Sequence, residues 1–182
     1  GGDDNNTVDY TDRHSSSNVR VNLSDTSKSH NSGTVTATMT GATSGMTDTL
    51  VNIQNVNTGG GDDTIWGNNE NNIINSGAGN DVIYGIGGTN TIYAGSAADT
   101  IYGGTGVDSI FGEEGNDYIY ASAGSDIIDG GANSDLVDYS ASSTGINLTL
   151  LDSGATVNVS HNIGGVASDS LTNIEGIKGS TT

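Results

Sequence analysis

A nine-residue period is the feature of this chain that most constrains its fold. From Thr58 to Asp138 the sequence divides into nine nonapeptides in one register: TGGGDDTIW, GNNENNIIN, SGAGNDVIY, GIGGTNTIY, AGSAADTIY, GGTGVDSIF, GEEGNDYIY, ASAGSDIID and GGANSDLVD. The eighth position is aliphatic in every copy, the sixth is Asp or Asn, and the first four are dense in Gly. A fixed period repeated this often indicates a solenoid, in which each repeat packs only against its neighbours.

The composition of each nonapeptide predicts the path of the chain. The last three residues form a short strand whose middle side chain points inward, because side chains alternate along a strand. The Gly-rich remainder forms a turn, because Gly permits positive φ angles and close backbone approach. Two nonapeptides therefore make one coil, and strands stack in parallel about 4.8 Å apart. We predict an all-β fold, a parallel β-roll (a right-handed β-solenoid), with almost no helix, since no segment has a capped 3.6-residue period.

The charge of the chain indicates bound cations. Asp and Glu total 22 against 4 Lys and Arg, so the formal net charge is −18. Such an excess destabilises a compact state unless cations neutralise it. The regular pattern and the abundance of β-branched residues argue against disorder. The charge also argues against binding nucleic acid or an anionic membrane surface, and no apolar run approaches the ~20 residues that span a bilayer.

The sixth positions fall into two columns, because nonapeptide n lies over n+2 in such a coil. One column is Asp63, Asp81, Asp99, Asp117 and Asp135, and the other is Asn72, Asn90, Asp108 and Asp126. Carboxylates at strand spacing repel one another, and a hard dication between successive loops reverses the sign of that interaction. Ca²⁺ takes six to eight oxygens at about 2.3–2.6 Å. Aspartates and turn carbonyls exposed by Gly supply such a shell.

The nonapeptide resembles the G-G-x-G-x-D-x-U-x repeat of the RTX (hemolysin-type) calcium-binding family. The resemblance implies several calcium ions held between loops n and n+2, and type I secretion of a bacterial protein that folds outside the cell. Carried over position by position, it assigns these metal-binding residues: Asp63, Asp81, Asp99, Asp117, Asp135, Asp108, Asp126, Gly59, Gly61, Gly77, Gly79, Gly95, Gly104, Gly106, Gly115 and Gly124.

The match to this motif is uneven along the roll. The best pairs are Asp63 with Asp81, Asp99 with Asp117, and Asp108 with Asp126. Ala97 and Asn133 replace fourth-position glycines beside other pairs. Asn72 and Asn90 lack charge, and Glu70 stands where Gly is expected. We predict weak or empty sites at the Asn corner.

The flanks of the roll carry a second, longer repeat. Residues 1–9 (GGDDNNTVD) are one more nonapeptide, the last of an upstream block. Residues 10–57 and 139–182 are β-rich spacers, which end on the similar runs DTLVNIQNV and DSLTNIEGI. The nine-repeat roll occupies residues 58–138. This order predicts a segment of a longer tandem array, with the second spacer leading to a further block.

The ninth positions form aromatic columns. Trp66, Tyr84, Tyr102 and Tyr120 share one face, and Tyr93 and Phe111 share the other. One interpretation is a stacked outer ladder, and the other is a platform for sugars or a partner subunit. We favour the ladder, because aromatic residues suit strand surfaces.

No pattern in the sequence indicates catalysis. His14, His30 and His161 are far apart, there is no Cys, and no G-x-S-x-G or H-E-x-x-H motif occurs. We expect a non-enzymatic, calcium-binding structural segment of an extracellular or cell-surface bacterial protein: an adhesin, surface layer or filament. The expected partners are calcium, other copies or neighbouring repeats of the same protein, and surface polysaccharide. The alternative is an accessory module of a secreted protease, lipase or alginate epimerase. Ice binding has little support, because the third positions form no Thr ladder.

Overall fold

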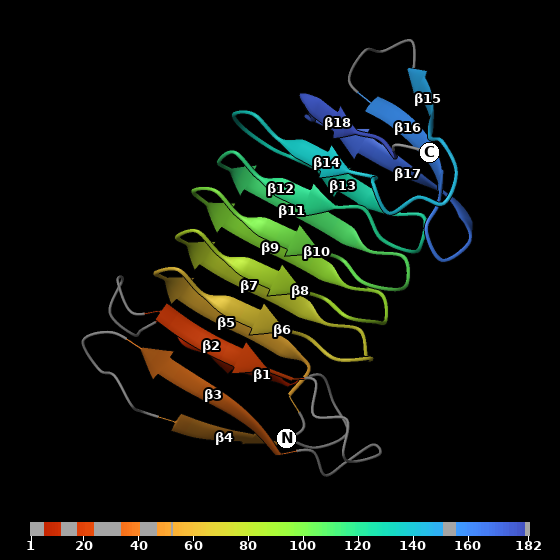
Figure 1. Ribbon diagram of the computed structural model, residues 1–182. Helices are drawn as coiled ribbons and strands as arrows, with labels where there is room; N and C mark the ends of the chain where they lie inside the picture. The colour runs from red at the N-terminus through yellow and green to blue at the C-terminus, as the bar shows by residue number, and fades with distance from the viewer. Residues whose placement is uncertain are drawn as a thin grey trace.

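Parallel stacking of short strands produces an elongated solenoid. The computed structural model describes residues 6–11, 18–23, 34–40, 47–51, 53–150 and 156–180. These residues form strands and turns without a helix, in about five turns of a β-solenoid. The prediction of an all-β parallel roll is therefore confirmed. Figure 1 shows the coils stacked in order along one axis, with further strands at each end.

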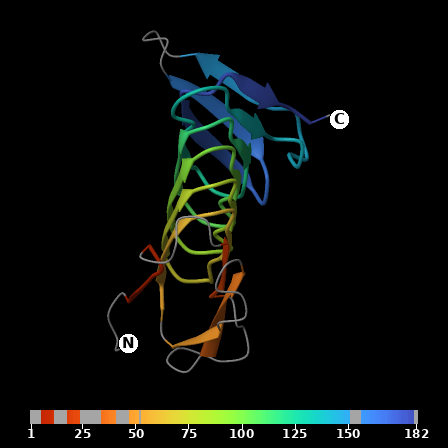
Figure 2. The ribbon, with the colours of Figure 1, turned by 90° about the vertical axis from the view of Figure 1, so that its left-hand side faces the viewer.

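Two nine-stranded sheets form the two faces of the solenoid. The first runs in the order β1 (Thr7–Asp9), β5 (Asn55–Gly60), β7 (Ile73–Ala78), β9 (Thr91–Ser96), β11 (Ser109–Glu114), β13 (Ile127–Asp129), β17 (Val166–Thr172), β16 (Thr156–Asn162) and β15 (Asn147–Leu150). The second runs in the order β18 (Gly176–Lys178), β14 (Leu136–Asp138), β12 (Tyr118–Tyr120), β10 (Thr100–Tyr102), β8 (Val82–Tyr84), β6 (Thr64–Trp66), β2 (Asn18–Asn22), β3 (Thr34–Thr40) and β4 (Thr47–Val51). The side view shows these sheets facing each other across a narrow interior (Figure 2).

The register of the roll is 18 residues per coil. Ile65 pairs with Ile83, and Ile101 pairs with Ile119, each in parallel strands. This register places every eighth-position side chain directly above another, in one aliphatic column per sheet. All nine of these residues are at most 1% exposed: Ile65, Ile74, Ile83, Ile92, Ile101, Ile110, Ile119, Ile128 and Val137. The core is therefore a thin double column, which leaves no room for a polar side chain at these positions.

The spacers contribute antiparallel strands at both ends. β2, β3 and β4 form one antiparallel group, and β15, β16 and β17 form the other. Buried and exposed side chains alternate along β2, as the two-residue period of a strand requires. Parallel stacking continues past the nonapeptides, because β13 pairs with β17 and β14 pairs with β18. Among the described residues, no helix is long and apolar enough to cross a membrane.

Candidate calcium sites

The aspartates of the sixth position form two buried, hydrogen-bonded columns. The amide N–H of Asp63 donates to Oδ1 of Asp81 over 2.7 Å, and that of Asp81 donates to Oδ1 of Asp99 over 2.7 Å. The same bond links Asp99 to Asp117 at 2.9 Å and Asp117 to Asp135 at 2.8 Å. In the other column Asp108 donates to Asp126 at 2.9 Å. One oxygen of each carboxylate therefore joins successive coils.

The second oxygen of most of these carboxylates has no donor. Oδ2 is buried without a hydrogen-bond partner in six aspartates of the described chain: Asp63, Asp81, Asp99, Asp108, Asp117 and Asp135. A buried polar atom that lacks a partner is costly and rare in native proteins. Because six such atoms recur at one position of the repeat, we expect each of them to have a partner of the same kind. A hard cation fits, because Ca²⁺ prefers carboxylate and carbonyl oxygens.

Burial gives these carboxyl groups strongly raised pKa values. Desolvation raises the pKa of Asp99 to about 8 and that of Asp63 to about 7. It raises the pKa values of Asp81, Asp108 and Asp117 to about 6. Without a cation, these groups must take up protons or leave the interior. A bound dication favours the charged form instead.

The turns supply the backbone shape that such sites need. All nine candidate glycines have φ between 99° and 151°, a region that L-residues rarely adopt. Ala97 and Asn133, which replace Gly, hold the same conformation at φ 85° and 92°. The backbone of the turn therefore has the same conformation at both substituted positions. At Gly115 an added Cβ would lie 1.7 Å from the carbonyl oxygen of Ala97 in the neighbouring coil, so a side chain there would push the coils apart.

A second set of glycines, at the first position of the nonapeptide, lies against the unpartnered oxygens. An added Cβ would lie 2.3 Å from Oδ2 of Asp117 at Gly112, 2.5 Å from Oδ2 of Asp135 at Gly130, and 2.9 Å from Oδ2 of Asp108 at Gly103. A side chain at these positions would collide with the unpartnered oxygen, so glycine is what allows Oδ2 to lie this close to the backbone. These glycines were missed as site residues from the sequence, although Gly at the first position of these copies was a usable signal.

The Asn corner is built differently. Nδ2 of Asn90 donates to the carbonyl oxygens of Gly87 and Gly103, at 3.2 and 3.4 Å. Nδ2 of Asn72 donates to the carbonyl oxygen of Gln54 over 2.6 Å. In this column the Asn side-chain amide donates hydrogen bonds to the backbone carbonyl oxygens. A carboxylate at the same position could not donate to them, and they would be free to bind a cation. That the sites at this corner are weak or empty stays a prediction.

Replacing Asp99 is expected to weaken calcium binding more than replacing Asn90. Asp99→Ala removes a charged oxygen that faces the site, whereas Asn90→Ala removes an amide that donates to carbonyls. We expect Asp99→Ala to lower the calcium stoichiometry in isothermal titration calorimetry, and Asn90→Ala to leave it nearly unchanged. The reverse order would overturn the ranking of the two columns.

Asp126 departs from the other candidate aspartates. Its Oδ2 accepts a hydrogen bond from Oγ of Ser122 over 3.0 Å, so it is not among the unpartnered oxygens. Its amide N–H donates to Oδ1 of Asp169 over 2.8 Å. Burial raises its pKa to about 6, as in the neighbouring coils. Asp126 therefore remains a candidate ligand, with a competing hydroxyl donor in place.

Two acids of the second spacer continue the columns. Oδ1 of Asp169 occupies the place above Asp126, and Oε2 of Glu175 accepts the amide N–H of Asp135 over 2.8 Å. Neither residue was predicted from the sequence as a ligand. Their spacing could have identified them. Each lies two residues before a buried or half-buried aliphatic residue, Leu171 or Ile177, just as the Asp of the nonapeptide lies two residues before its aliphatic residue.

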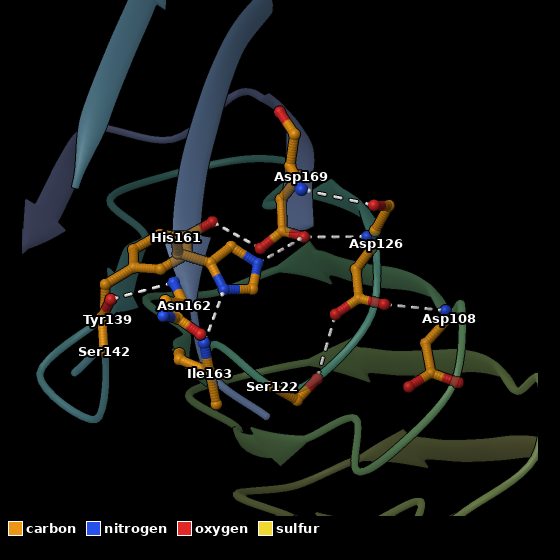
Figure 3. Close-up of polar contacts among 11 residues, drawn as sticks. Asp108, Ser122, Asp126, Tyr139, Ser142, His161, Asn162, Ile163 and Asp169 are labelled. Carbon is orange, nitrogen blue, oxygen red and sulfur yellow. Dashed lines mark hydrogen bonds and ion pairs between the residues drawn. The ribbon is translucent and has the colours of Figure 1, made fainter. Parts of the chain in front are cut away.

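Protein donors satisfy the carboxylate of Asp169 (Figure 3). The hydroxyl of Tyr139 donates to Oδ2 over 2.7 Å, and Nε2 of His161 lies 3.2 Å from Oδ1. Nδ1 of His161 accepts the amide N–H of Ile163 at 3.3 Å, which places the proton on Nε2. Burial, together with the charge of Asp169, raises the pKa of Tyr139, so its hydroxyl stays a donor. Tyrosine and histidine thus supply at the end of this column the donors that the aspartates of the roll lack.

The aromatic columns form stacked ladders. Ring centroids are 5.6 Å apart from Trp66 to Tyr84, 4.7 Å from Tyr84 to Tyr102 and 4.2 Å from Tyr102 to Tyr120, with interplanar angles of at most 11°. On the other sheet Tyr93 and Phe111 stack at 5.0 Å. These rings pack on one another along the sheet, as the ladder interpretation requires.

The described residues contain no group of three or more His, Cys, Asp or Glu side chains arranged to hold one metal ion. A calcium ion at the aspartate columns would therefore need backbone carbonyl oxygens beside the carboxylates. His161 is buried in the network above, whereas His14 and His30 lie outside the described residues.

Comparison with known protein families finds a match over the nonapeptide roll. The model of the RTX calcium-binding nonapeptide repeat, which describes four copies, matches residues 54–83, 84–119 and 102–137. These segments cover the roll and the strand that leads into it. No curated protein matches the chain.

Proposed function

Because residues 54–137 belong to the RTX calcium-binding nonapeptide repeat family, we propose that this chain is a structural segment of a secreted or cell-surface bacterial repeat protein. The segment folds as it binds calcium. RTX repeats bind calcium and are typical of secreted bacterial proteins. Outside the cell, calcium neutralises a chain of formal charge −18. An adhesin, a surface layer or an extracellular filament uses such a segment as a stiff spacer.

The six buried carboxylate oxygens without donors carry this proposal. They recur through the roll, and their aspartates are at most 2% exposed. A catalytic carboxylate pair needs an open cleft that admits substrate. Buried acids spaced along the length of a solenoid suit ions that join neighbouring coils. The proposed role is therefore structural and non-enzymatic.

Electron microscopy of the native protein tests the structural role. Negative-stain images of material taken from the cell surface or the medium are expected to show filaments or a lattice in calcium. Chelator is expected to disperse them. Separate particles that carry a catalytic domain would contradict the proposal and favour a module of a secreted enzyme.

A further inference from the structure

The two spacers are built on the same plan. β15, β16 and β17 repeat the antiparallel order of β2, β3 and β4. The hydrogen bonds that connect each spacer to the nonapeptide before it also correspond. Tyr10 donates its amide N–H to the carbonyl of Asn57 over 2.8 Å, and Tyr139 donates to that of Lys178 over 2.7 Å. The amide of Asn6 donates to Oε1 of Gln54 over 3.0 Å, as that of Asp135 donates to Glu175.

These contacts place the two spacers in one alignment. β18 corresponds to β5, with Ile177 in the place of Val56. β15 corresponds to β2, with Leu148 in the place of Val21. Strand pairing supports this alignment independently. Leu148 lies opposite Val159 in the pair β15–β16, and Val21 lies opposite Ala37 at the corresponding position of the pair β2–β3.

In the first spacer, the roll covers both the first strand, β2, and the last strand, β5. β2 pairs in parallel with β6, which sets Val21 against Ile65. β5 pairs in parallel with β7, which sets Val56 against Ile74. Val21 and Val56 are 0% exposed. One coil of the roll therefore covers two strand edges and two aliphatic side chains at once.

In the second spacer, the corresponding strands are the outermost of their sheets. Among the described strands, β15 pairs only with β16, and β18 pairs only with β14. Leu148 is 53% exposed, and Ile177 is half-buried. Figure 1 shows this end of the solenoid beyond the last coil of the roll. Two strand edges and two aliphatic side chains thus lie open where the first spacer has them covered.

We infer that β15 and β18 form a docking seat for the first coil of another nonapeptide roll. The occupant is defined by the first spacer: a strand like β6 pairs in parallel with β15, and a strand like β7 pairs in parallel with β18. The coil must present both strands together, which suits a solenoid and excludes a single extended peptide. The seat deepens the structural role proposed above and rests on it. It makes successive rolls one continuous solenoid.

An extended chain tests the seat. Lys178 corresponds to Asn57, so Thr182 corresponds to Gly61, and a copy of residues 62–138 placed directly after Thr182 continues the register. In calcium, amide hydrogen exchange at 147–150 and 176–178 is expected to slow by roughly 100-fold relative to the 182-residue chain, because the new strands protect these amides. Insertion of one Gly before the copy is expected to abolish most of this protection, because a one-residue slip reverses the faces of a strand.

Paired substitutions locate the effect. In the extended chain, Leu148→Asp is expected to restore fast exchange at 147–150. Val166→Asp changes an 89% exposed aliphatic residue off the seat and is expected to have little effect. Unchanged exchange in the extended chain overturns the inference, whether or not the added roll folds. Protection that appears in the 182-residue chain as its concentration rises also overturns it, in favour of pairing between two copies. A calcium titration of the same samples separates this failure from failure of the calcium-binding role.

Discussion

In excess chelator at pH 8, the chain is expected to lose its β-sheet circular dichroism signal and to regain it when calcium is added. Each occupied site contributes about 2.7 kcal/mol when free calcium is 100 times its Kd. Three or four sites therefore contribute about 10 kcal/mol, comparable to the whole stability of a typical domain at about 5–15 kcal/mol. Without calcium, Oδ2 of six aspartates in the described part of the two columns lies buried without a donor. A far-ultraviolet spectrum that stays unchanged in chelator would refute calcium-dependent folding.

The pH sets the size of this effect. The pKa values of about 8 for Asp99 and about 7 for Asp63 lie above the ordinary value of 3.8. The folded, calcium-free state thus binds more protons than the unfolded chain between about pH 4 and pH 8, so its stability falls as the pH rises through this window. We expect the chelated chain to keep more β-signal near pH 5.5 than near pH 8. Calcium binding near pH 6.5 is expected to release protons, which titration in buffers of different ionisation enthalpy detects.

Replacing one core isoleucine is expected to destabilise the calcium-loaded roll strongly. Ile101 is 0% exposed and lies between Ile83 and Ile119 in its column. Ile101→Ala leaves a cavity in a core one side chain wide, and substitutions of this kind cost about 2–5 kcal/mol. Urea denaturation in saturating calcium measures the change in the free energy of unfolding.

Ile127→Ala is the matched control for this substitution. Ile127 is the same residue type in a strand of the same roll, but it is 54% exposed. Its removal is expected to change the free energy of unfolding by about 0.5 kcal/mol or less. Equal effects at the two positions would contradict the assignment of the eighth-position column as the core.

The sequence determined the repeating part of this protein. The period of nine and the alternation of side chains place Ile65 against Ile83 and Asp63 against Asp81, because every coil repeats the same local geometry. The same regularity placed the positive-φ turns at the candidate glycines. The repetition of the nonapeptide carries this information, because it sets an 18-residue register between neighbouring coils.

Only the tertiary structure decided how the repeat ends and which carboxylates differ. Asp169 and His161 meet through an antiparallel pairing whose register no local pattern sets. The bond of Ser122 to Asp126, and that of the Asn90 amide to Gly103, depend on contacts between atoms that the period alone does not specify. Where the sequence does not repeat, non-local packing sets the strand register. The strand pairing at the ends of the solenoid therefore could not be predicted from the sequence.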